Sequence, residues 1–481
     1  MEPPFTIEFP GGDPTFTKEI WVVRGSPSNL ILGEGWTTIA RTALAYAPNL
    51  KRVTIPASVT RIGMGAFFKS VGLEQVTFAP ESRLTIIENS AFSGATSLLR
   101  FDVPPSVTRI DADVFNGATS LKQVTFDPEC HLDRISDRVF SDALALEMIN
   151  LPPSVTVIGP GAFSGATALQ TIYIPESVVS IENDAFRAAT SLTQITFDPN
   201  SKLVGIGRSV FSGATSLREI RIPSTVRSIG QHAFSVASSL ANVIFEPDSS
   251  LKMIGASAFQ QTDLQTISIP ASVEKMGWHV FTGEKRLTNV TFEKGSQLKS
   301  IEYGTFTGVI ALETIEIPPS VTSIDPRAFS GATTLKQVTF LPGSNINSIG
   351  ESAFADTSLK LVVMGKPALD RLNATADLND PARQPLRFGD GNTFYGKAGV
   401  SITSMAGQAD AFFNVARNRG LPRDAARLSA SFLTGLKPEK IKTSQEGGRK
   451  WATRKGGRKA AIKRTKKRAS NRRNKTRRSA H

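Results

Sequence analysis

The stretch Ile158–Ile174 reads IGPGAFSGATALQTIYI and is followed by Pro175. Close copies recur through most of the chain, as in IENSAFSGATSLLRFDVP from Ile87 and IDPRAFSGATTLKQVTF from Ile324. The phenylalanine of each Ala-Phe, Val-Phe or Thr-Phe pair returns every 22–25 residues, and a period of this length predicts a solenoid of stacked repeats. The thirteen phenylalanines are Phe67, Phe92, Phe115, Phe140, Phe163, Phe186, Phe211, Phe234, Phe259, Phe281, Phe306, Phe329 and Phe354.

A single unit, Leu121–Ile135, shows how the repeat should fold. Its apolar residues Leu121, Val124 and Phe126 point inward, and the last two alternate with polar residues, which predicts a half-buried strand. Pro128 ends the strand, because proline cannot donate to the ladder. A second apolar approach and a short turn then return the chain to the next strand. Because no unit can bury its own apolar face, stacking is expected to bury Ile on Ile and Phe on Phe in continuous ladders.

Two step lengths alternate through much of the array, and the corner after the strand explains them. The 23-residue form leaves the strand through Ile-Pro-x-Ser-Val or a close variant, as in IPSTV at Ile222–Val226. The 25-residue form leaves through TFDPNSKL at Thr196–Leu203 or a similar segment. The two extra residues should widen one corner and form a ridge at every second coil.

The pattern L-x-x-V-x-I-P-x-S-V-x-x-I-G-x-x-A-F resembles the BspA-type class of leucine-rich repeats. The resemblance covers about residues 50–361, roughly two thirds of the chain. It implies a β-rich, α/β-type leucine-rich-repeat solenoid of about 13–14 coils of 23 or 25 residues, with short helical or 3-10 turns. It also implies a protein-binding surface, since members are known as bacterial surface and adhesion proteins, with large sets in unicellular eukaryotes and some large DNA viruses. The resemblance brings no catalytic residues with it.

The composition divides the chain into four segments. Residues 1–30 are acidic, rich in Pro and Gly, and lack the pattern of a secretory signal, so we expect an N-terminal cap. Residues 31–364 form the solenoid. Residues 365–436 are predicted to form a linker followed by a short helical C-terminal cap. The linker part, up to about residue 400, is rich in Asp, Asn, Pro and Gly. The alternative to the cap is a separate small interaction module. No run is long and apolar enough for a membrane span.

Residues 437–481 predict a disordered Lys/Arg-rich tail. They hold 19 Lys and Arg against 2 Glu, while the remaining 436 residues hold 37 basic and 40 acidic residues, a net charge of −3. With little apolar content the segment cannot bury enough to fold alone. Its charge would allow it to bind a polyanion such as nucleic acid, to act as a nuclear import signal or to attach to an anionic membrane surface. The remaining alternative is a solvated charged segment that has no partner. The predicted polyanion-binding residues are Arg458, Lys459, Lys463, Arg464, Lys466, Lys467, Arg468, Arg472 and Arg473.

No catalytic, cofactor-binding or metal-binding pattern emerges, so we expect a protein that is not an enzyme and holds no cofactor. The single cysteine, Cys130, precludes an internal disulfide, and Cys130 with His131 lacks the spacing of a metal site. The segment GNTFYGKA at Gly391–Ala398 lacks the Ser or Thr of a phosphate-binding loop. Carboxylates such as Asp111 and Asp113 are expected at the repeat surface with no convergent partner.

The residue between the two inward strand positions is expected on the exposed sheet face, where partners of leucine-rich repeats commonly dock. This row is mostly small and polar, as an exposed strand requires, and its middle departs furthest from that norm. Aromatic, Arg and apolar residues favour interface cores. The candidate partner-binding face is therefore Tyr173, Thr196, Arg221 and Ile244.

Together these features predict a non-enzymatic repeat scaffold for protein–protein interaction whose cationic tail binds a polyanion or directs nuclear import. We expect a monomer in an intracellular location, with the nucleus as the candidate compartment. The alternative is a BspA-like cell-surface adhesion or binding protein.

Overall fold

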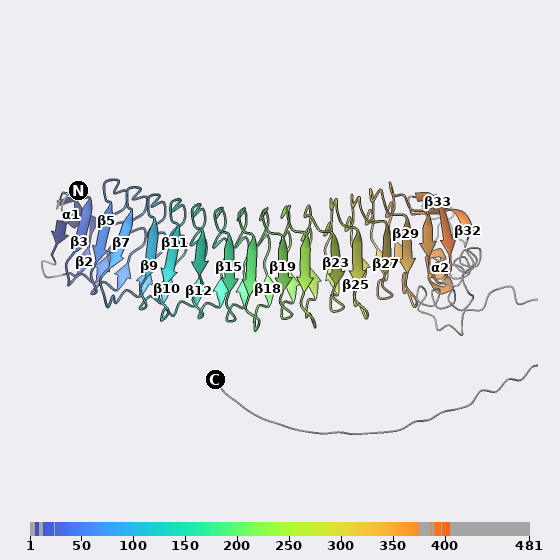
Figure 1. The fold of residues 1–481 in the computed structure, drawn as a ribbon, viewed down its shortest axis with the longest axis horizontal. Coiled ribbons are helices and arrows are strands. Elements are labelled where there is room, and N and C mark those ends of the chain that lie inside the picture. The colour runs from blue at the N-terminus through green and yellow to red at the C-terminus, as the bar shows by residue number, and fades with distance from the viewer. Residues whose placement is uncertain are drawn as a thin grey trace, which may run out of the picture. The chain divides into compact units, whose positions relative to one another are not determined.

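The structure, a computed structural model, describes residues 5–8, 13–23, 25–374, 386, 389–395 and 397–404. They belong to one compact unit, Met1–Ala411. They form a parallel β-solenoid in which each turn of the chain contributes a long and a short strand (Figure 1). The expected leucine-rich-repeat solenoid is confirmed, with about 15 turns rather than 13–14. The predicted helices and tail beyond residue 404 lie outside the described residues.

The long strands form one side of the solenoid. In a typical one, β15, the pattern Thr-Ile-Tyr-Ile alternates exposed and buried side chains, as the period of two predicts. The long strands are β3 Asn29–Leu32, β5 Arg52–Ile55, β7 Gln75–Phe78, β9 Arg100–Val103, β11 Gln123–Phe126, β13 Met148–Asn150, β15 Thr171–Ile174, β17 Gln194–Phe197, β19 Glu219–Ile222, β21 Asn242–Phe245, β23 Thr266–Ile269, β25 Asn289–Phe292, β27 Thr314–Ile317, β29 Gln337–Phe340 and β31 Leu361–Val363.

The short strands form a second side, and each points one apolar residue into the core. They pair in parallel with the short strands of neighbouring coils, as Ile181 does with Ile206. They are β4 Thr38–Ile39, β6 Arg61–Ile62, β8 Ile86–Ile87, β10 Arg109–Ile110, β12 Arg134–Ile135, β14 Val157–Ile158, β16 Ser180–Ile181, β18 Gly205–Ile206, β20 Ser228–Ile229, β22 Met253–Ile254, β24 Lys275–Met276, β26 Ser300–Ile301, β28 Ser323–Ile324 and β30 Ser348–Ile349.

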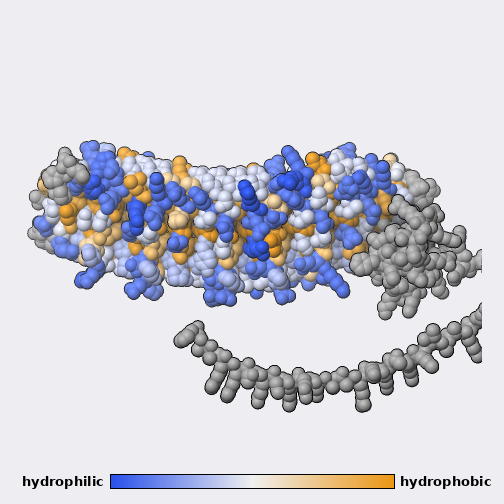
Figure 2. Space-filling model, viewed as in Figure 1, coloured by the Kyte–Doolittle hydropathy of each residue, from blue (hydrophilic) through white to orange (hydrophobic). Residues whose placement is uncertain are grey.

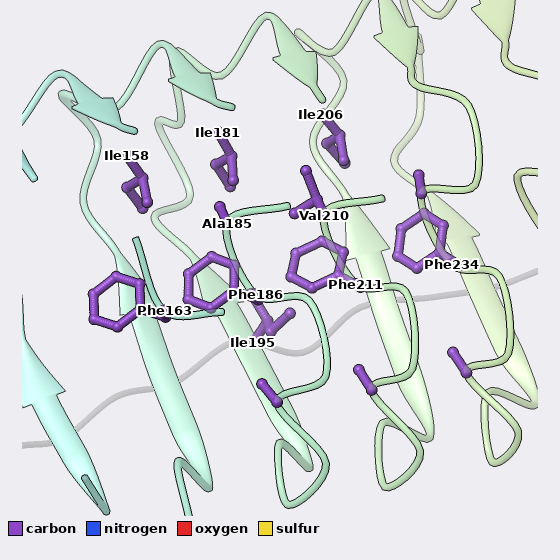
Figure 3. Packing of buried hydrophobic residues seen from close by; sticks show 14 of the residues in the cluster. Ile158, Phe163, Ile181, Ala185, Phe186, Ile195, Ile206, Val210, Phe211 and Phe234 are labelled. Atoms are coloured by element: carbon purple, nitrogen blue, oxygen red, sulfur yellow. The ribbon is translucent and has the colours of Figure 1, made fainter. Parts of the chain in front are cut away.

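A continuous stack of phenylalanine rings runs through the core, as the repeat predicted. Phe211 is fully buried and lies 5.5 Å from the ring of Phe186 and 5.3 Å from that of Phe234, with interplanar angles of 12° and 22°. Figure 3 shows this row of rings beside a second row that includes Ile181 and Ile206. The ring separations match the spacing of neighbouring strands, so each coil contributes one rung.

The third side of the solenoid is a tight turn that contains the buried phenylalanine. In the Phe211 turn the backbone N–H groups of Ser209, Phe211 and Gly213 donate to carbonyls of the next coil at 2.7–2.9 Å. Ser209 and Gly213 both have a left-handed backbone, with φ of 54° and 74°. The same two positions are left-handed in every coil from Thr42 to Asp356, which explains the recurring glycine of the Ser-Gly-Ala segment.

The left-handed position predicts a matched pair of mutants. Gly213→Val should lower the free energy of unfolding by about 1–2 kcal/mol, because a β-branched residue is strained at positive φ. Crowding is not the cause, since an added Cβ would meet nothing nearer than 3.7 Å. Denaturant unfolding measures the effect, and Ser212→Val is the control because Ser212 has no positive φ. Equal losses in both variants would show that side-chain size matters rather than backbone strain.

The hydrogen-bond ladder of the long strands is interrupted at intervals. No pairing joins β17 to β19, β21 to β23 or β25 to β27, and β7 pairs with β9 only through Gln75 and Arg100. Each interruption follows a strand that ends in phenylalanine and leads into the 25-residue corner. We infer that the two extra residues of that corner separate the coils there. β11 and β29 also end in phenylalanine before a longer corner, but they pair with the next strand along two and three residues.

The N-terminal segment extends both sheets instead of only covering them. β1 (Phe5–Ile7) pairs in parallel with β3, and β2 (Thr15–Phe16) pairs with β4. The helix α1 (Lys18–Val23) follows, with Trp21 buried. Phe16 packs edge-on against Trp36 at 5.5 Å, which fills the core before the phenylalanine stack begins.

The C-terminal end differs from the expected linker. α2 (Lys366–Asn373) packs three apolar side chains inward, and β32 (Gly389–Phe394) and β33 (Lys397–Thr403) form a hairpin. β33 pairs in parallel with β31, and Phe394 continues the ring stack 5.3 Å from Phe354. The linker prediction for this part was wrong because Gly and Asn were taken as loop signals. The alternation of buried Val400 and Ile402 with half-exposed Ser401 is a strand pattern.

Candidate binding face

The exposed row of the long strands lies where the sequence predicted it. Parallel pairing aligns Asp102 with Thr125, Arg221 with Ile244, and Ser268 with Thr291. Along the row most side chains are exposed, whereas Thr125 and Ile244 are half-buried and Thr339 is buried beside the last coils. We call this surface the long-strand face. Its members are Thr77, Asp102, Thr125, Asn150, Tyr173, Thr196, Arg221, Ile244, Ser268, Thr291, Glu316 and Thr339.

The four candidate partner-binding residues form two adjacent pairs on the long-strand face. Tyr173 pairs with Thr196 across β15 and β17, and Arg221 pairs with Ile244 across β19 and β21. The interruption between β17 and β19 separates the pairs. The four side chains therefore follow one another along consecutive coils, and we call them the central patch.

Local contacts orient the two largest side chains of the central patch. The hydroxyl of Tyr173, which is 46% exposed, donates to Asp198 Oδ2 at 2.5 Å. This hydrogen bond lowers the pKa of Asp198 and raises that of the Tyr173 phenol. Arg221 Nη2 lies 3.3 Å from Glu219 Oε1. Both contacts are with neighbours on the surface of the solenoid, so the tyrosine ring and the guanidinium stay available to a partner.

A hollow of about 700 Å³ opens on the same side of the solenoid, nearer the N-terminus. Gln75, Thr77 and Phe78 of β7 line one wall, and Arg100 and Asp102 of β9 line the other. The strands are joined there by a single residue pair, which leaves Phe78 only partly buried. This hollow was not predicted from the sequence. The signal for it was the strand-ending Phe78 followed by the longer corner.

Three of the charged groups that line the hollow, Glu74, Arg100 and Asp102, form ion pairs. Arg100 Nε donates to Asp102 Oδ1 at 2.8 Å, and the Thr125 hydroxyl donates to the same carboxylate. Glu74 lies 3.1 Å from Lys51 Nζ. Figure 2 likewise shows hydrophilic residues in separate groups with neutral or hydrophobic surface between them. The described surface in this view therefore mixes polar and apolar residues.

The carboxylates Asp111 and Asp113 have partners, contrary to the sequence-based expectation. Asp111 lies 2.6 Å from Arg109, and Asp113 lies 2.7 Å from Arg138 of the next coil. Burial raises the pKa of Asp113, but hydrogen bonds from Arg138 and Asn116 outweigh it and hold that pKa below its usual value. Each carboxylate is matched by one guanidinium: Asp111 pairs within its own coil and Asp113 joins two coils. The two carboxylates therefore form no acid–base pair.

Cys130 is a core residue. Its thiol is 3% exposed and donates to the Val107 carbonyl oxygen at 3.4 Å, and burial raises its pKa. Within the described ranges, no group of three His, Cys, Asp or Glu side chains is placed to hold a metal ion. The predicted polyanion-binding residues between Arg458 and Arg473 all lie outside the described residues.

The fold and the exposed row define a leucine-rich-repeat solenoid, and comparison with known families gives its type. The family model described as the BspA type leucine rich repeat region, six copies, matches residues 37–170, 133–260, 159–288 and 252–375. These matches cover more than half of the chain, so the protein belongs to the BspA-type leucine-rich-repeat family. No curated protein is similar enough to count as a match.

Three solved structures that are similar to this chain come from bacterial proteins. A leucine-rich repeat protein from Bacteroides ovatus is 23% identical, with a TM-score of 0.40 over 70% of this chain and 84% of that one. A leucine rich cell surface protein from Faecalibacterium prausnitzii is 26% identical, with a TM-score of 0.39 over 76% and 92%. The pneumococcal vaccine antigen PcpA is 20% identical, with a TM-score of 0.36 over 68% and 75%.

The family and the fold together describe a repeat scaffold of the protein-binding or cell-surface kind. Such solenoids are typically non-enzymatic. Among the described residues, no helix has the length and apolar character needed to cross a membrane.

Proposed function

We propose that the chain is a non-enzymatic scaffold that binds a partner protein through the long-strand face. The observation that carries the proposal is the alignment of Tyr173, Thr196, Arg221 and Ile244 along successive coils. An aromatic ring, a guanidinium and an aliphatic side chain next to one another are the residue types that dominate protein interfaces. The exposed polar residues Thr171, Gln194, Glu219 and Asn242 on the same strands supply a rim.

The test compares two pairs of substitutions on one face. Tyr173→Ala should weaken binding of the partner by about 30-fold, which corresponds to a hot-spot loss of about 2 kcal/mol. Arg221→Ala should act in the same direction. The control is Ser268→Ala with Thr291→Ala, an aligned pair in the same row outside the central patch. The partner is isolated by cross-linking in the source cell, and its affinity for each purified variant is then measured.

The pattern of affinity changes among these variants shows where on the solenoid the partner binds. Unchanged affinity in both central-patch variants would contradict the proposal for the patch. Equal weakening by the control pair would mean that contact is spread along the row. Thr77→Arg, which fills part of the hollow beside β7, separates a partner seated there from one seated on the central patch.

We further propose that the cationic segment, residues 437–481, binds a polyanion and that nucleic acid is the class it suits best. The support is compositional, because 19 Lys and Arg are concentrated in a segment whose only aromatic residue is Trp451. Contacts to phosphates rather than to bases follow from that composition.

The alternative function is binding at the cell surface, which membership of the BspA-type family favours. The comparisons give no support for the nuclear location expected from the sequence. Antibody labelling of an epitope-tagged chain, in intact and then in permeabilised source cells, distinguishes the two. Labelling of intact cells would support the surface protein and contradict a scaffold that acts on nucleic acid inside the cell.

A further inference from the structure

One turn of the solenoid is a residue short. Four residues separate Phe259 from Leu264, whereas five separate Phe234 from Leu240 in the coil before it. The step from Phe259 to Phe281 is consequently 22 residues, the shortest in the repeat. A stacked coil that loses one residue leaves space and unpaired backbone groups inside a tightly packed turn.

A glutamate from the next coil occupies that place. Glu284 stands three residues after Phe281, where the equivalent turns have the small residues Ala214 and Ala237. It is fully buried. Its Oε1 accepts hydrogen bonds from Thr262 N at 2.6 Å and Thr262 Oγ1 at 2.9 Å, and its Oε2 accepts one from Leu264 N at 3.2 Å. All three donors belong to the shortened turn.

The full-length turns show which bond the carboxyl replaces. In them the N–H of the equivalent leucine donates to a backbone carbonyl of its own turn, as Leu240 N does to Ala237 O at 2.9 Å. The second short turn, after Phe354, uses its own threonine instead, because Leu359 N lies 3.4 Å from Thr357 Oγ1. In the Phe259 turn the Leu264 N–H instead donates a hydrogen bond to Glu284 of the neighbouring coil.

We propose that the Glu284 carboxyl replaces the missing main-chain acceptor of the preceding turn. Its hydrogen bonds stabilise the contact between the two coils, and this stabilisation decreases as the pH rises. The charged groups nearby are Asp263 on the short turn, paired with Arg286 at 2.9 Å, and the exposed Lys285. The following turn presents the apolar residues Val309 and Ile310. No cation is therefore bonded to the buried carboxyl among the described residues.

The direction of the pH effect follows from the surroundings of the carboxyl. Burial raises the pKa of Glu284 from 4.5 to about 7, against the opposing effect of the hydrogen bonds from Thr262 and Leu264. A carboxyl with a raised pKa favours the folded state fully below pH 4.5 and loses this contribution as the pH rises through 7. If local opening exposes the group, the opening equilibrium should increase about tenfold between pH 6 and pH 8.

Amide hydrogen exchange in the full chain tests both the replacement of the acceptor by Glu284 and its pH dependence. After correction for the intrinsic exchange rate, the amides of Thr262 and Leu264 should open about tenfold more often at pH 8 than at pH 6. Glu284→Gln keeps an acceptor without a charge, so its exchange should lose this pH dependence. Glu284→Ala should increase opening of the Leu264 amide by at least about tenfold. The Leu359 amide, in the self-bonded short turn, is the internal control.

A rescue experiment distinguishes a replaced acceptor from general packing. Insertion of one alanine between Gln261 and Thr262 restores the five residues that separate the phenylalanine from the leucine in a full-length turn. In that background Glu284→Ala should no longer increase opening and should stabilise the chain, since the buried carboxyl has lost its donors. Unchanged Leu264 exchange in Glu284→Ala, or equal losses with and without the insertion, would overturn the replacement. If exchange of the Thr262 and Leu264 amides had the same pH dependence in the wild type and in Glu284→Gln, Glu284 would not be the source of that dependence.

Discussion

Replacing Phe211 with alanine should lower the free energy of unfolding by about 3–5 kcal/mol. The ring is fully buried and stacked between Phe186 and Phe234, so its removal leaves a cavity that neither neighbour can fill. In a solenoid each coil contacts only the coils beside it, which confines the loss to the two adjoining interfaces. The halves of the solenoid on either side should then unfold in separate transitions.

Denaturant unfolding followed by tryptophan fluorescence and by circular dichroism measures this uncoupling. Trp36 lies near the N-terminal end and Trp278 lies beyond the mutated coil, so both halves carry a reporter. Tyr173→Ala is the control, because that ring is 46% exposed and leaves no buried cavity. A single transition at the wild-type midpoint in the Phe211 variant would contradict the view that the ring stack couples the coils.

The regular part of the fold was predictable because each unit repeats the same physical requirement. The spacing of the phenylalanines predicted one rung per coil, and the alternation in segments such as Thr171–Ile174 predicted the outward direction of Tyr173. The longer corner after Phe197 predicted a ridge at every second coil. It did not predict that the ladder itself would open between β17 and β19, because pairing depends on how two corners of different length pack.

The exceptions to the repeat were harder to predict, since their partners are distant in the sequence. Glu284 interrupts the pattern of small residues, and only the stacked structure shows that its carboxyl fills the short turn 20–22 residues earlier. The C-terminal hairpin was misread because its first strand is Gly-rich. The hollow beside Phe78 arises where β7 and β9 separate. Phe78 and the longer corner mark the position, but the same pattern after Phe126 leads into a strand that does pair, so the pattern alone does not predict a separation.

The cationic segment yields the prediction with the largest effect. If about ten of its nineteen positive charges contact phosphates at once, the slope of log affinity against log salt should be roughly −7 to −9. Affinity for DNA or RNA should then fall on the order of 10⁴–10⁵-fold between 50 and 200 mM salt. Residues 1–436, with a net charge of −3, should bind negligibly in the same fluorescence-anisotropy titration.

Charge rather than sequence should determine this binding, and two variants of the full chain separate these causes. Shuffling residues 437–481 preserves all nineteen charges and should leave both affinity and slope unchanged. Replacing Lys463, Arg464, Lys466, Lys467 and Arg468 with glutamine removes five charges and should make the slope shallower by up to about 4. A shallow wild-type slope, or equal binding by residues 1–436, would reject phosphate neutralisation as the cause. Binding to anionic vesicles without binding to nucleic acid would assign the segment to a membrane surface instead, because lipid headgroups present the same charge without a polynucleotide backbone.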